Sequence, residues 1–148
     1  MSRPPITIGW REWLDLPDLG LSDIKAKIDT GARTSALHAF EVTPFQERGR
    51  PRVRFSMHPV HRSDATVQVC EADIVDERLV TNSGGQRDKR YVIETTLCLA
   101  GSEWPIEVTL TARDDMMFRM LLGRTAMRDR LIVDPSQSYL MGKRHVRP

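Results

Sequence analysis

Most of this chain alternates apolar and polar residues with a period of two, which is the pattern of β-strands buried on one face. The clearest example is 24–28, where Ile24, Ala26 and Ile28 share one face and two lysines occupy the other. Further strand candidates are 6–10, 36–42, 52–57, 66–70, 72–75, 78–81, 90–97 and 104–111. The compact apolar run 119–124 is another, and 132–135 and 138–142 are short strands or an extended tail. The pattern therefore predicts a mostly β protein.

Two segments interrupt the run of strands. The sequence 82–86, Asn-Ser-Gly-Gly-Gln, separates two strand candidates and predicts the tip of a hairpin. The segment 125–131 has the spacing of a short helix, with its expected N-cap at Thr125 or just before it. We expect one helix near the C-terminal end.

Composition narrows the class of protein. The 148 residues are long enough for one domain with its own core, and 28% charged residues are ordinary for a globular chain. A net charge of +2 is too small to indicate a nucleic-acid partner. No apolar run approaches the length of a membrane span, and the first residues lack the apolar core of a signal peptide, so we expect a cytoplasmic protein with no membrane partner. Cys70 and Cys98 are far apart and predict reduced, partly buried thiols.

The segment 28–37 is the strongest candidate for chemistry. A strand that ends at Asp29-Thr30-Gly31-Ala32 offers one carboxylate on a sharp turn, since glycine lets the backbone fold back closely. On these four residues alone an ordinary turn or a helix N-cap is the simpler interpretation. Other motifs in the chain are needed to choose between these interpretations and a catalytic role for Asp29.

Further motifs supply that context. A Gly-tipped hairpin follows the Asp-Thr-Gly segment, and Leu121-Leu122-Gly123-Arg124 precedes the predicted helix. This order resembles the retropepsin class of aspartic peptidases. A closer resemblance is to the bacterial RimK-associated, RimB-like retropepsin family, also described as ATP-dependent zinc proteases. It rests on Gly-Trp-Arg-Glu at 9–12, on 24–37 and on 118–124.

The resemblance implies a retropepsin-like closed β-barrel, the acid protease fold, with one short C-terminal helix. The whole chain, 1–148, would form a single domain. Its catalytic loop would be 28–37, its flap about 80–90, and its Leu-Leu-Gly-Arg strand and helix about 119–131.

Peptide hydrolysis of this kind needs two carboxylates that share one proton. The chain has one Asp-Thr-Gly, so the resemblance implies a homodimer in which two copies of Asp29 form the dyad. Thr30 would hydrogen-bond across the two-fold axis, and Gly31 would bring backbone close to the substrate. The segments 7–10 and 138–141 are candidates for the dimer interface.

The resemblance also assigns a substrate-binding set. Retroviral members carry an acidic residue where this chain has Arg33, so Arg33 and Arg124 would face one region without an acidic partner. We therefore expect an acidic peptide, such as a glutamate-rich tail made by a RimK-type ligase, with help from Lys89, Arg90 or Arg113. The implied set is Ala32, Arg33, Thr34, Ser83, Gly84, Gly85, Arg90 and Arg124.

Other interpretations stay open. The arginines could be solvated or paired with Asp114 and Asp115, and Gly84-Gly85 could be a plain hairpin turn. A non-catalytic retropepsin-fold module that binds acidic peptides or regulates a glutamate ligase is the alternative function.

The zinc and ATP in the family description lack matching motifs here. The chain has no His-Glu-x-x-His and no Gly-rich phosphate loop. His58, His61 and Cys70 could in principle meet at a zinc ion, but loop histidines on the surface are the simpler interpretation. We expect no metal and no cofactor.

Overall fold

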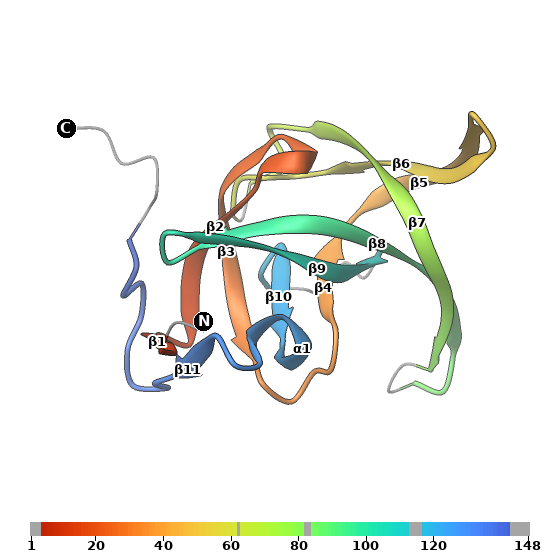
Figure 1. Ribbon diagram of the computed structural model, residues 1–148. Helices are drawn as coiled ribbons and strands as arrows, with labels where there is room; N and C mark the ends of the chain where they lie inside the picture. Colours follow the sequence, from red (N-terminus) through yellow and green to blue (C-terminus); the bar gives the residue numbers. More distant parts are fainter. Residues whose placement is uncertain (1–3, 62, 82–83, 113–116, 143–148) are drawn as a thin grey trace.

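The structure is a computed structural model that describes residues 4–61, 63–81, 84–112 and 117–142 (Figure 1). Strands dominate these residues, and a mostly β fold with one short helix is confirmed. The elements are β1 Ile6–Ile8, β2 Arg11–Leu16, a 3-10 turn Pro17–Leu19, β3 Leu21–Asp29, β4 Ser35–His38, β5 Phe40–Glu47, β6 Arg50–Met57, β7 Gln68–Thr81, β8 Arg87–Leu99, β9 Ser102–Thr111, β10 Met120–Gly123, α1 Arg124–Met127 and β11 Leu131–Val133.

The main sheet closes on itself. Its nine strands run in the order β2-β3-β10-β4-β9-β8-β7-β6-β5, and β2 also pairs with β8 where Asp15 lies opposite Cys98. The strands from β2 to β8 in this order therefore form a ring, while β7, β6 and β5 extend away from it (Figure 1). The closed barrel that the resemblance implies is confirmed.

The alternating pattern of β3 places its apolar face inside this ring. Ile24, Ala26 and Ile28 are buried, whereas Lys27 is exposed. Facing strands supply the rest of the core, including Leu14, Leu16, Leu37, Phe55, Leu97, Val108, Met120 and Leu122. Burial of this one face drives the barrel together, because apolar area removed from water is the main favourable contribution to folding.

The hairpin expected in the middle of the chain is formed by β7 and β8, with Arg78 opposite Arg90 in the register. Both strands are longer than the sequence pattern predicts. A register shift between Ile74 and Asp76 moves the alternation by one residue, so a period-two pattern breaks there although the strand continues. Ser83, expected at the tip, lies outside the described residues.

The helix differs from its predicted bounds. Its N-cap is Gly123, two residues before Thr125, and α1 ends at Met127 instead of continuing to 131. Asp129 has a φ of +65°, which a right-handed helix cannot contain, so the chain turns away there into β11. The segment 138–142 is neither a strand nor an extended tail: Leu140 and Met141 lie in a turn that the bond from Gly142 N–H to Tyr139 O closes.

A buried carboxylate connects the two ends of the described chain. Glu12 on β2 is fully buried, and its Oε2 accepts hydrogen bonds from Gly9 N–H (2.7 Å) and Leu140 N–H (2.9 Å). Its Oε1 accepts a third from Met141 N–H (3.1 Å). Backbone bonds from Trp10 N–H to Gln137 O and from Tyr139 N–H to Arg11 O continue this seam. The late segment is thereby held against β2.

We expect Glu12→Gln to lower the free energy of unfolding by about 2–4 kcal/mol, because the amide turns a donor toward backbone N–H groups that need an acceptor. Urea denaturation measures the change. Glu103→Gln, at an exposed position on β9, is the matched control and should leave stability nearly unchanged. Equal stability of the two variants would contradict the role given to Glu12.

Candidate functional site

The loop after β3 presents a single carboxylate. Asp29 is the last residue of β3 and is half-buried, while Thr30 and Gly31 are exposed. Gly31 N–H donates to Asp29 Oδ1 (3.1 Å), and Ala32 N–H donates to Asp29 O (3.2 Å). A Cβ on residue 31 would lie 3.3 Å from Asp29 Oδ1, so glycine lets the carboxylate approach its own backbone. This tight turn orients the Asp29 side chain.

Residues 123–125, at the end of β10 and the start of α1, bind the Asp29 loop, and this contact is called the clamp. Strand β10 lies between β3 and β4, and its last residue, Gly123, is aligned with Asp29 in the parallel register. The first N–H groups of a helix have no partner within the helix. In α1 these groups reach the loop: Arg124 N–H donates to Ala32 O (2.8 Å) and Thr125 N–H to Arg33 O (3.1 Å). The helix therefore needs no side-chain cap at Thr125.

Gly123 makes this clamp possible by its lack of a side chain. A Cβ at this position would lie 2.6 Å from Thr34 C and 2.8 Å from Thr34 O. Gly123 N–H also donates to Ser35 Oγ (3.0 Å), a bond buried inside the barrel. Its φ of −87° is ordinary, so close approach rather than backbone conformation requires the glycine.

Arg33 and Arg124, two of the three arginines in the predicted binding set, line different hollows near the loop. Arg124 Nη1 donates to Gly31 O (3.2 Å). Thr30 and Arg124 line an open hollow of about 350 Å³ together with residues of α1 and β11. Arg33 and Thr34 line a separate hollow of about 320 Å³. The structure thus brings both arginines to the loop but not into one shared hollow.

The hairpin reaches the loop through a residue that the sequence analysis missed. Arg78 on β7 donates from Nη1 to Thr34 Oγ1 (3.4 Å), from Nη2 to Glu107 Oε1 (3.1 Å) and from Nε to Asp76 Oδ2 (2.8 Å). The hydrogen bond from Arg78 lowers the pKa of the Asp76 carboxyl, and the bond from Glu77 N–H lowers it further by a smaller amount. The sequence signal that could have identified Arg78 is Asp-x-Arg, which places Asp76 and Arg78 on one face of a strand. In the structure Arg78 lies opposite Arg90 in the hairpin.

The end of β7 and the start of β8, which belong to the predicted flap, lie at the same end of the molecule as the loop and α1 (Figure 1). Gly84 and Gly85 are exposed at its tip, and Gly85 has a φ of +80°. Arg90 is half-buried opposite Arg78. Arg113, Asp114 and Asp115 lie outside the described residues.

The candidate zinc ligands are each engaged elsewhere. The His58 ring stacks on Phe40, and that of His61 lies against Phe118. Cys70 donates its S–H to Leu19 O, and burial raises the pKa of its thiol to about 11, so the thiolate that a metal needs is disfavoured. Within 4–61, 63–81, 84–112 and 117–142, no three His, Cys, Asp or Glu side chains gather as a metal site would require. Across the same ranges, no helix has the length and apolar character needed to span a membrane.

The chain resembles known proteins both in sequence and in fold. The sequence model described as "RimB-like: Retropepsin-like aspartic endopeptidase RimB" matches residues 7–144. A Legionella pneumophila protein of unknown function has a similar crystal structure, with a TM-score of 0.77 and 28% identity over 92% of this chain and 98% of that one.

Longer proteins also contain a matching region. A probable alpha-L-glutamate ligase of Shewanella pealeana is 45% identical over 97% of this chain, and one of Desulfotalea psychrophila is 46% identical over 92%. These matches cover 31% and 29% of the relatives, respectively. The chain therefore spans about a third of the length of these curated relatives.

We expect Gly123→Ala to destabilise the protein by about 3 kcal/mol, because the new methyl group must push Thr34 and the loop away. Thermal or urea unfolding measures the change. Gly101→Ala is the control: its φ of +74° strains an alanine, but nothing lies within 4 Å of the added carbon. That variant should lose only about 1 kcal/mol. A Gly123→Ala protein as stable as the Gly101→Ala protein would contradict the close packing of the clamp.

Proposed function

Because this chain belongs to the RimB-like family of retropepsin-like aspartic endopeptidases, we propose that it hydrolyses peptide bonds with two Asp29 carboxylates, one from each chain of a homodimer. The observation that carries the proposal is the half-exposed Asp29 on a loop that backbone bonds from α1 hold in place. One oxygen of this carboxylate, Oδ1, accepts the bond from Gly31 N–H, and the side chain as a whole is only half-buried.

The chemistry follows from pairing two such carboxylates. One takes a proton from a water molecule, which attacks the peptide carbonyl carbon, and the other donates its proton to the carbonyl oxygen. Exposed Thr30 lies next to the carboxylate, where it would bond to its copy across the two-fold axis. The β7–β8 hairpin would close over the peptide and exclude water.

The proposed substrate is an acidic peptide. Arg124 and Arg33 line separate hollows that include Thr30 and Thr34 of the Asp29 loop, and Arg78 and Arg90 lie opposite each other on the hairpin. Guanidinium groups bind carboxylates well because their planar donors match both oxygens. The relatives named as probable glutamate ligases support a glutamate-rich tail as the substrate and a RimK-type ligase as the partner. Such a tail would be met in the cytoplasm.

A second candidate function has its own support. The matching region is about a third of relatives named for ligase activity, so the same fold could serve there as a non-catalytic module that binds acidic chains. This alternative requires binding of acidic peptides without cleavage. The fate of the Asp29 variant separates the two functions.

We expect Asp29→Asn to reduce cleavage of an oligo-glutamate peptide by at least about a thousandfold, because an amide cannot act as the base or share the dyad proton. The assay compares this peptide with a neutral peptide of equal length from acidic to neutral pH, with and without a chelator. Asp129→Asn is the matched control, since Asp129 is exposed and its φ of +65° suits asparagine. Undiminished cleavage by Asp29→Asn would reject the carboxylate mechanism, and loss of activity with the chelator would favour a metal.

We also expect specific activity to rise with protein concentration in parallel with the dimer fraction, because each chain supplies one carboxylate. Sedimentation velocity measures the dimer fraction over the same range. Thr30→Ala should weaken the dimer about tenfold, the equivalent of one lost hydrogen bond. Full activity from a strict monomer at every concentration would rule out the shared dyad.

A further inference from the structure

The hollow next to the end of the catalytic loop contains an arginine–carboxylate pair that the proposed mechanism does not use. It has a volume of about 320 Å³, and Arg33, Thr34, Arg78 and Glu107 contribute its polar side. Arg33 and Arg78 supply two positive charges, and two carboxylates, those of Glu107 and of Asp76 beside the hollow, bind Arg78. The hollow is also wide enough for a glutamate side chain and several water molecules, each of about 30 Å³.

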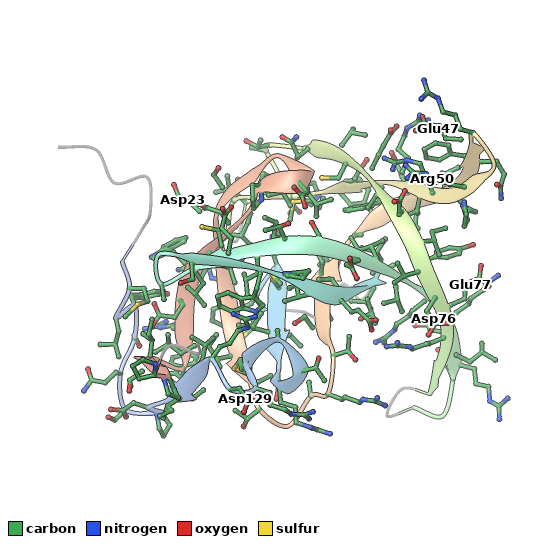
Figure 2. The ribbon with its side chains drawn as sticks, viewed as in Figure 1. Asp23, Glu47, Arg50, Asp76, Glu77 and Asp129 are labelled. Carbon is green, nitrogen blue, oxygen red and sulfur yellow. The ribbon has the colours of Figure 1, made fainter. Side chains whose placement is uncertain are left out.

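Arg78 holds its guanidinium in this hollow through three different acceptors. Asp76, its neighbour on the same strand, binds Nε at 2.8 Å, and Figure 2 shows Asp76 on the long β7 strand. Glu107 Oε1 on β9 binds Nη2 at 3.1 Å, and Thr34 Oγ1 lies 3.4 Å from Nη1. Asp76 therefore fixes the plane of the guanidinium even when the bond to Glu107 is broken.

The ion pair between Arg78 and Glu107 can break at little cost in stability. The two side chains are 37% and 49% exposed, and ion pairs this open to water contribute little to stability. Glu107 also lies directly opposite Glu94 in the β8–β9 register, where two like charges disfavour each other. A second carboxylate of suitable shape can therefore replace Glu107 at low cost.

We propose that Arg78 is the receptor for a side-chain carboxylate of the substrate, and that Glu107 is a built-in competitor that occupies this receptor when no substrate is bound. The inference rests on the proposed peptidase function and identifies a specificity-determining pair within it. Arg33 lines the same hollow and adds attraction for an anion. Because Thr34 belongs to the loop of Asp29, a carboxylate bound at Arg78 fixes where the peptide lies relative to the reacting bond.

The test measures peptide binding in the Asp29→Asn background, so its outcome does not depend on hydrolysis. Two peptides of equal length are compared, one of glutamates and one of glutamines, by calorimetry or fluorescence anisotropy. Glu107→Gln should lower the Kd of the glutamate peptide by about threefold, since the competitor is gone. Arg78→Met should raise that Kd by about tenfold, and neither change should alter the Kd of the glutamine peptide.

A second ion pair provides the control. Arg54 Nε and Glu71 Oε2 lie 2.7 Å apart on β6 and β7, with side chains 55% and 36% exposed, and neither residue lines the hollow. Glu71→Gln and Arg54→Met should leave both Kd values unchanged. Tighter binding of the glutamate peptide to Glu107→Gln alone supports the exchange.

Two results overturn the inference. The first is an unchanged Kd for the glutamate peptide in Glu107→Gln, and the second is an equal change for both peptides. Cleavage by the wild-type protein is scored separately. A wild type that cleaves neither peptide rejects the proposed peptidase function, while the binding data still decide the role of Arg78.

Discussion

The candidate site depends on the contact between the end of β10 and the loop that carries Asp29. Within the loop, local bonds make only a tight turn. The bonds that hold Ala32 and Arg33 come from Arg124 and Thr125, far along the chain, and they form only if residue 123 has no side chain. Bringing such distant segments together costs chain entropy, which burial of the barrel core must offset. The Asp29 loop therefore takes this geometry only when the whole barrel is folded.

Glu12 performs a comparable task at a different place. Its carboxylate collects N–H groups from residue 9 and from 140 and 141, so it joins the first strands to the last described segment. Strands β1 and β11 also pair with each other within one chain. Segments that the resemblance offered for a dimer interface are thus already engaged inside the protomer. A second copy would have to approach along their outer edges or over the face that bears Thr30.

The sequence predicted the features that rest on local patterns. Alternation located β3, glycines located the hairpin tip, and Asp-Thr-Gly located the turn of Asp29. It failed where tertiary contacts decide. The helix start at Arg124 depends on acceptors from the distant loop, and the length of β7 depends on a register shift against β8. Arg78 was missed because a charged residue on an exposed strand has no local signature of the distant Thr34 that it contacts.

The bonds from α1 to the loop also connect the residue proposed for catalysis with the residues proposed for substrate selection. Asp29 stands at the start of the loop, and Thr34, which Arg78 contacts, stands near its end. Between them, the carbonyl groups of Ala32 and Arg33 are bound to α1, so neither end of the loop can shift independently. Selection of a carboxylate at Arg78 would then act on position as well as affinity. A peptide with its acidic side chain at the wrong spacing would bind there and still miss the dyad, because productive hydrolysis requires the reacting carbonyl group within contact of both carboxylates.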